Sequence, residues 1–396
     1  MKWKKLLIIF IIFTSLFFSG CMGSKELNTI SLTISIGIDK SAEGYSITYQ
    51  VLNPKAIAST KATNDSPFFL YTEKGKDIFE IIRRITTISP RKLYNSHLRV
   101  VVFGEEVAKE GIQQLLDFFI RDHEFRTDFY FIVAKGTTAS EVLKTITPME
   151  NVSGLEMYDS IRSSLKAWAP TRDVKIVELV NSIVSDGINP VLTGVEIIEP
   201  KSDFNSVNGL KQSENTKLKL SGLSVFKKDK LVGWLSEDES KGYNYIKQTV
   251  ENTSSHVQID KQNKISIEVI KTKSKVKAYM LNNKPAINVD IKLTVNITAE
   301  TGIFDVSTQE NAEKIERLMD DKINEFCMSA VNKAKEDFGT DIFGFGEEIH
   351  RTYPKLWKTL KNNWNDKFTK LPVSVNVNTK VNGLGENTKS IFSKGE

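Results

Sequence analysis

The feature that most restricts the fold of this chain is a regular alternation of apolar and polar residues from position 287 to position 297. The apolar positions in it are Ile287, Val289, Ile291, Leu293, Val295 and Ile297. Successive side chains of a β-strand point to opposite faces, so the alternation predicts a strand with one buried face and one wet face. A shorter alternation at Ile265, Ile267 and Val269 predicts a partner strand. One wet face is typical of antiparallel sheets, and we expect an antiparallel sheet here.

Helices are predicted to follow this sheet. Ser307 and Glu310 match a capping box and predict the start of a long amphipathic helix. Pro354 cannot donate to a continuing helix, so it should restart a second helical segment, before a last alternating strand that begins at Val373. These elements define an expected C-terminal domain over residues 263–384, with a loose polar tail at 385–396.

The first half of the chain mixes strand and helix patterns. Alternation over Leu27–Ile38 and again over Tyr45–Leu52 predicts a hairpin, whereas the isoleucines after Lys76 repeat at helical spacing. The continuous apolar run Leu98–Phe103 predicts a strand inside a sheet. The mixture predicts a multi-domain α+β fold, in which mixed and antiparallel sheets pack against amphipathic helices.

Composition suggests where this fold divides. A chain of 396 residues is too long for one core and predicts two or three domains. We expect an N-terminal α+β region at 27–199, a polar linker at 200–217 rich in Ser, Asn and Lys, and a small middle β/α domain at 218–262.

The N-terminus predicts a lipoprotein signal peptide over residues 1–20. A basic head is followed by about 15 uncharged residues that end in Ser19-Gly20-Cys21, which is short for a membrane span of roughly 20 residues. Small residues before a cysteine resemble the lipobox of bacterial lipoproteins, although Phe18 stands where an aliphatic residue is usual. The resemblance implies a diacylglyceryl group on Cys21, cleavage before it, and a lipidated tether at 21–26. An uncleaved anchor helix and an ordinary secreted protein are the alternatives.

Charge and cysteine content narrow the classes of function. The formal net charge is +5, and removal of the three leader lysines lowers it to +2, with basic and acidic residues interleaved. Nothing in this balance indicates a nucleic-acid partner. With Cys21 lipidated, Cys327 is left alone, and we expect a buried structural thiol. The four histidines form no zinc pattern, so we expect neither a metal site nor a cofactor.

No motif in the sequence names a reaction, and we expect no catalytic residues. The weak candidates have simpler explanations as helix ends or solvated helix faces: Asp122-His123-Glu124, the group Glu347, Glu348 and His350, and the basic cluster Arg83, Arg84, Arg91 and Lys92. This basic cluster could also meet an acidic partner or lipid headgroups. The stripe of Tyr353, Trp357 and Trp364 is expected in the core, and Gly344 and Gly346 are expected to form a tight turn that seats Phe343 and Phe345.

A series of motifs resembles the Ger(x)C lipoproteins, the C subunits of spore germinant receptors. Those motifs, in chain order, are Lys25-Glu26-Leu27-Asn28, Ile36-Gly37-Ile38-Asp39-Lys40, Ser89-Pro90-Arg91-Lys92-Leu93-Tyr94, Arg121-Asp122-His123-Glu124-Phe125-Arg126, Leu231-Val232-Gly233-Trp234-Leu235 and Asp341-Ile342-Phe343-Gly344-Phe345-Gly346-Glu347. The resemblance covers nearly the whole chain. It implies a non-enzymatic receptor subunit on the outer face of the spore inner membrane, which is the cytoplasmic membrane.

The implied partners are integral membrane subunits of the A and B types, together with the membrane lipid through Cys21. Nutrient germinants would act through the complex. The alternative function is a solute-binding lipoprotein of a transporter, which would need two doubly wound lobes. An anchored envelope hydrolase is a third possibility, for which the sequence offers no nucleophile.

Overall fold

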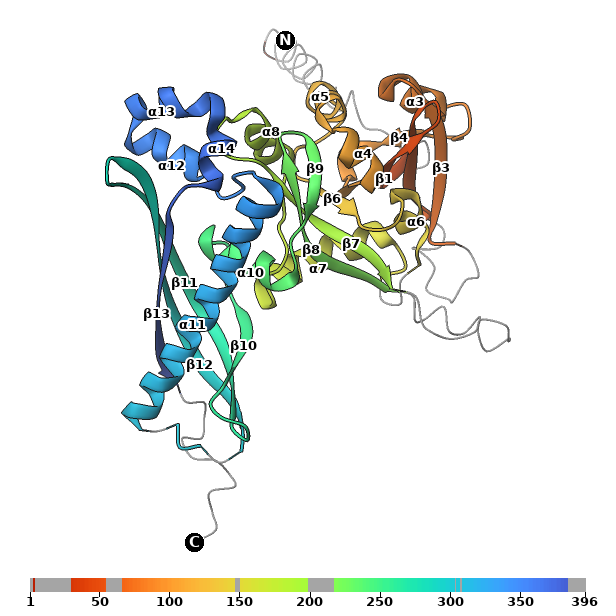
Figure 1. Ribbon diagram of the computed structural model, residues 1–396. Coiled ribbons are helices and arrows are strands. Elements are labelled where there is room, and N and C mark those ends of the chain that lie inside the picture. The colour runs from red at the N-terminus through yellow and green to blue at the C-terminus, as the bar shows by residue number, and fades with distance from the viewer. Residues whose placement is uncertain are drawn as a thin grey trace.

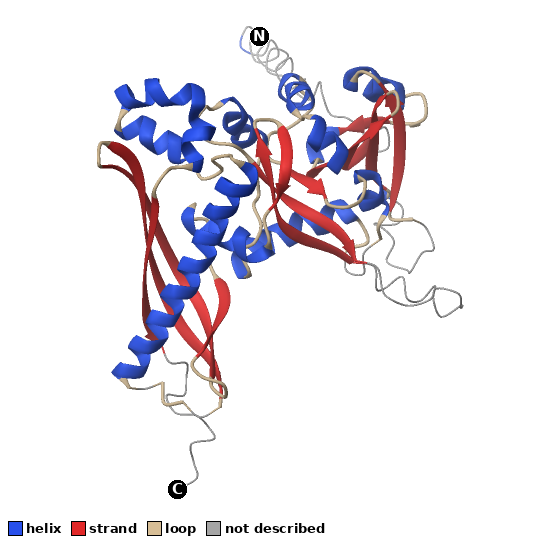
Figure 2. Cartoon of the chain, viewed as in Figure 1, coloured by secondary structure: helices blue, strands red, loops and turns tan. Residues whose placement is uncertain are grey.

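A computed structural model describes Trp3 and residues 30–54, 66–146, 150–198, 217–302, 304–306 and 308–383. Within these residues the strands form two sheets, and helices pack on both (Figures 1 and 2). The predicted α+β class with mixed sheets is confirmed. Cys21, the tether, the capping residue Ser307 and the tail after Gly383 lie outside the described residues.

The first sheet contains nine of the described strands, in the order β3-β2-β1-β5-β6-β7-β8-β9, with β4 paired to β1. These strands are β1 Ile30–Ser41, β2 Gly44–Leu52, β3 Phe68–Gly75, β4 Lys92–Tyr94, β5 Val100–Phe103, β6 Tyr130–Ala134, β7 Val191–Ile198, β8 Lys217–Lys227 and β9 Lys230–Trp234. The predicted hairpin is β1–β2. The central strands β1, β5, β6 and β7 run parallel, and antiparallel strands extend the sheet on both sides.

Helices cover both faces of this first sheet (Figure 2). They are α3 Ile78–Ile85, α4 Glu105–Glu110, α5 Gln113–Arg121, α6 Ala139–Lys144, α7 Ser153–Ala167 and α8 Ile176–Val184. The residues of α3, α4, α5 and α8 share one hydrophobic cluster, and those of α6 and α7 share another on the opposite face. A parallel centre needs such double cover because both of its faces are apolar.

The second sheet has the order β10-β11-β12-β13, with β10 Thr253–Gln258, β11 Lys264–Leu281, β12 Lys284–Thr301 and β13 Val373–Gly383. The alternating residues of β11 and β12 pair antiparallel, as predicted. The prediction of an all-antiparallel sheet is wrong for β13, which runs parallel to β12. A parallel neighbour needs a crossover connection, and helices α11 to α14 supply it.

The helices after the first sheet are α10 Glu237–Ile246, α11 Gln309–Lys333, α12 Phe345–Thr352, α13 Pro354–Leu360 and α14 Trp364–Thr369. The long helix α11 lies along one face of the second sheet, and α12–α14 sit near one end of it (Figure 1). The capping prediction at Ser307 is displaced by one residue, because Thr308 is the N-cap and its hydroxyl accepts from the amide of Asn311 at 3.3 Å. Pro354 begins α13, as predicted.

The expected middle region does not form a sheet of its own. Its strands β8 and β9 extend the first sheet through antiparallel pairing of β8 with β7. Its helix α10 packs against α11, and a Cβ at Gly242 would lie only 2.0 Å from the carbonyl oxygen of Phe326. The expected linker lies outside the described residues except for Lys217. Where the domain boundaries fall stays a prediction.

Candidate functional sites: an apolar groove, a filled cleft and a buried joint

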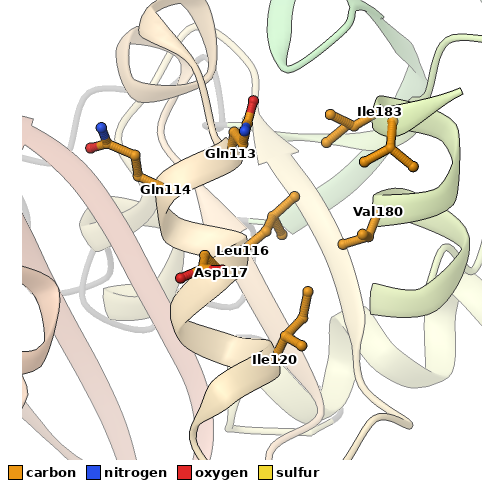
Figure 3. Close-up of a pocket in the computed structure, with 8 residues that line it drawn as sticks. Gln113, Gln114, Leu116, Asp117, Ile120, Val180 and Ile183 are labelled. Carbon is orange, nitrogen blue, oxygen red and sulfur yellow. The ribbon is translucent and has the colours of Figure 1, made fainter. Parts of the chain in front are cut away.

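An apolar groove lies between α5 and α8 (Figure 3). Leu116 and Ile120 of α5 face Val180 and Ile183 of α8 across a cavity of about 390 Å³. Ile120 is 55% exposed and Val184, at the end of α8, is 70% exposed. Such side chains beside a hollow can receive apolar side chains of a partner, because burying them removes apolar surface from water.

The polar residues of this groove lie at its rim. Gln114 and Asp117 point away from the α8 side in Figure 3. The carboxylate of Asp117 accepts a hydrogen bond from Nε of Arg121 at 2.7 Å, so it is held by its own helix. The groove therefore has the properties of a docking site for apolar groups and lacks a pair of groups suited to acid–base chemistry.

A second cleft, of about 320 Å³, lies at the carboxyl ends of β1, β5 and β6, where α/β proteins usually bind ligands. The carboxylate of Asp39 occupies it and accepts hydrogen bonds from the amides of Ala139 at 2.8 Å and Ser140 at 2.9 Å. Burial raises the pKa of Asp39 above its ordinary value, while the two backbone donors act in the opposite direction. Asp39 thus takes the place at the start of α6 that a ligand anion could otherwise fill.

The other charged side chains at this cleft are also paired within the chain. Glu105 accepts from the amide of Gly136 at 2.8 Å and meets Nζ of Lys109 at 3.1 Å. Lys40 pairs with Glu110. The Asp39-Lys40 motif therefore binds groups of this chain at the carboxyl ends of β1, β5 and β6.

Asp341 lies in a buried contact between the two halves of the chain, where the turn before α12 meets the segment before β7. We call this contact the joint. The carboxylate of Asp341 accepts four hydrogen bonds, from the amides of Phe343 and Gly344 at 2.9 Å, the amide of Gly346 at 2.8 Å and the indole Nε1 of Trp364 at 3.0 Å. Complete burial raises the pKa of Asp341 to about 6, against the effect of these donors. The carboxylate thereby fixes the turn that starts α12.

The same turn contacts the first sheet. The backbone amide of Asn189, just before β7, donates to the carbonyl of Asp341 at 2.7 Å. A Cβ on Gly346 would lie 2.7 Å from Cα of Gly187, so the two backbones approach closely only because both residues are glycines. Gly344 adopts a φ of +80°, which confirms the expected tight turn.

The side chains singled out from the sequence lie mainly where the simpler explanations put them. Phe343, Phe345, Trp357 and Trp364 are buried in the core, and Tyr353 packs at its edge. Cys327 is fully buried, and burial raises the pKa of its thiol. The acids Glu347 and Glu348 lie in the first turn of α12.

The remaining candidates lie at the surface. His123 is exposed just beyond the end of α5. Of the basic cluster, Arg84 pairs with Glu80 and Lys92 pairs with Glu124. The structure does not gather these residues into one site. The groove at Ile120 and Val184, and the role of Asp341, were missed from the sequence. An aspartate followed by glycines at the third and fifth positions is a turn signal that could have identified the joint.

No helix among the described residues combines the length and apolar character needed to cross a membrane. In the same part of the chain, no group of three or more His, Cys, Asp or Glu side chains is placed to hold a metal ion.

Comparison with known proteins identifies two family models along the chain. The family model "Spore germination protein N-terminal domain" matches residues 23–197, and "Spore germination B3/ GerAC like, C-terminal" matches residues 221–385. The fold is also that of the crystal structure of the GerBC protein, with a TM-score of 0.57, 21% identity, and coverage of 87% of this chain and 96% of that one.

Curated relatives match along nearly their whole length. Spore germination protein KC of Bacillus subtilis (strain 168) is 27% identical over 392 residues, 96% of each chain. Spore germination protein B3 of the same organism is 24% identical and covers 92% of this chain and 94% of its own. The chain is thus an α+β protein of the spore germination class. It belongs to the Ger(x)C family.

Proposed function

We propose that this chain is a lipid-anchored, non-enzymatic subunit of a nutrient germinant receptor, assembled with integral membrane subunits of the A and B types. The observation that carries the proposal is the ordered match of both family domains over 23–197 and 221–385, which begins two residues after Cys21. The chain would lie on the outer face of the spore inner membrane.

The structure supports a role in assembly over a role in catalysis or solute capture. The cleft at the carboxyl edge of the first sheet is filled by Asp39 and by internal ion pairs. The apolar groove beside Ile120 and Val184 offers a surface for an apolar segment of an integral partner. A solute-binding lipoprotein would need two doubly wound lobes, and the antiparallel hairpin β11–β12 does not suit such a lobe.

An anchor would convert weak contacts with integral partners into stable association, because it raises the local concentration of the chain at the membrane. Cys21→Ala should therefore release the chain from the spore inner-membrane fraction and reduce the nutrient germination rate by about 100-fold. Ser24→Ala, which leaves the lipobox intact, should leave both unchanged. Full germination by spores in which Cys21→Ala has left the membrane would contradict the proposal.

A further inference from the structure

Lysines gather on one face of the second sheet. Lys271, Lys273, Lys275 and Lys277 occupy alternate positions of β11 after its bulge, and all four are exposed. Alternate positions of a strand share a face. Lys292 of β12 pairs across from Lys273 and joins the same face. We call these five residues the lysine face.

The positive charge of the lysine face is not balanced within the chain. Lys273 and Lys292 are directly opposite, an arrangement that destabilises a sheet through like-charge repulsion. Asp290 lies on this face beside the lysines, and it is held by Lys277 at 3.4 Å and by the amides of Asn288 and Asn376. Glu268 lies further along the same face, before the bulge, and accepts from the amide of Asn252 at 2.9 Å. In the part of the chain that the structure describes, no ion pair involves the other four lysines.

None of the helices that the structure describes covers the lysine face. The opposite face of the sheet carries the buried residues of β11 and β12 and packs against α11 (Figure 1). Over β11, β12 and β13 the lysine face is hollowed by an open cavity of about 520 Å³, whose lining includes Lys273, Lys275, Lys277 and Lys292 together with Asp290 and Asn376. Several ammonium groups can therefore reach one anion in the hollow.

The lysine face ends in apolar side chains at the tip of the β11–β12 hairpin. Tyr279 and Leu281 continue the same alternation beyond Lys277, and Leu281 is 43% exposed. Lys284 pairs across from Leu281. Basic residues beside a half-buried aromatic and an exposed aliphatic side chain are typical of surfaces that bind at the boundary between headgroups and acyl chains.

We propose that the lysine face binds the anionic headgroups of a lipid bilayer. Lysine ammonium groups act as mobile point charges and suit phosphates that lack a fixed orientation, whereas the planar fork of arginine suits directional recognition. The hollow accommodates a headgroup phosphate, and the hairpin tip meets the acyl boundary. This contact rests on the proposed membrane location and adds to it, since it would fix the orientation of the second sheet against the bilayer.

The test uses the full lipidated chain in vesicles of phosphatidylcholine, or of equal parts phosphatidylcholine and phosphatidylglycerol. A short pulse of amine acetylation followed by mass spectrometry measures the reactivity of each lysine. On the anionic vesicles we expect Lys271, Lys273, Lys275 and Lys292 to react about fivefold more slowly, and this protection to vanish at about 1 M salt. Lys314, on α11, should react equally on both vesicles.

A variant pair separates this contact from the anchor. In chains that carry Cys21→Ala, the double variant Lys273→Gln/Lys292→Gln should bind added anionic vesicles about 25-fold more weakly. The matched double variant Lys314→Gln/Lys333→Gln removes the same charge from α11 and should bind as the parent does. A failure of the anchor proposal would appear instead as loss of the wild-type chain from phosphatidylcholine vesicles.

Equal reactivity of the lysine face on both vesicles would overturn the proposal, as would equal binding by the two double variants. Protection that needs integral spore-membrane proteins, and that lipid alone does not produce, would also overturn it. That result would assign the lysine face to an acidic protein partner.

Discussion

At the scale of single residues, two aspartates in family-like motifs organise the backbone around them. Asp39 holds the first amides of α6, and Asp341 holds the turn before α12. Both carboxylates accept hydrogen bonds from donors of this chain. In both motifs the aspartate therefore has a structural role.

Replacement of Asp341 with Asn should lower the free energy of unfolding by about 3 kcal/mol. Each carboxylate oxygen accepts two N–H donors, so an amide NH2 in either orientation would face two buried donors and leave them unsatisfied. Urea denaturation at pH 8, above the raised pKa of Asp341, measures the effect. Asp366→Asn, at an exposed position of α14, is the control and should change the free energy of unfolding by less than about 0.5 kcal/mol. An unchanged unfolding midpoint for Asp341→Asn would show that the joint contributes nothing.

The burial of single residues was largely predictable from the sequence. The contacts between residues far apart in the sequence were not. Cys327 and Trp357 follow from helical periodicity, since apolar residues at such spacing share one face. The contact of Asn189 with Asp341 joins residues 152 positions apart, and no local pattern encodes it.

At the scale of elements, the groove between α5 and α8 is a surface suited to an apolar partner. Each helix buries its apolar stripe against the first sheet, yet Ile120 and Val184 remain exposed beside the groove. Exposed apolar residues next to a hollow are typical of interaction sites.

Ile120→Asp and Val184→Asp should each abolish co-purification of the integral subunits with this chain from detergent-solubilised spore membranes. A charge in the apolar groove would have to lose its water when the partner docks. Because both side chains are already exposed, the free energy of unfolding should change by less than about 0.5 kcal/mol. Ile270→Asp, on the second sheet, serves as the matched control and should keep the partners. Undiminished co-purification by both groove variants would exclude this surface.

Strand existence was easier to predict than strand length or direction. The alternation at Ile265, Ile267 and Val269 indicated only the first part of β11, which continues through the charged residues Lys273–Lys277 because its lysines alternate onto the wet face. The parallel direction of β13 depends on a crossover through four helices, which alternation alone cannot indicate. The same limit applies to β8 and β9, which fall in the expected middle region and whose place on the first sheet no local pattern indicated.

At the scale of the whole molecule, the chain combines two sheets. Helices cover both faces of the first sheet, whereas α11 packs on one face of the second sheet and leaves its lysine face exposed. The joint at Asp341 and the close packing of α10 on α11 connect them. This arrangement leaves the groove on the first half and the lysine face on the second, as two separate surfaces available for contacts. Two separate surfaces and an internally paired cleft are what the proposed assembly role requires.

The central claim is that a lipid group on Cys21 holds the folded part of the chain at the membrane. Mass spectrometry of the N-terminal peptide, isolated from spore inner membranes, tests it most directly. We predict a peptide that begins at Cys21 and carries a thioether-linked diacylglyceryl group. A peptide that retains residues 1–20, or one that begins elsewhere or has a free thiol at Cys21, would contradict the account.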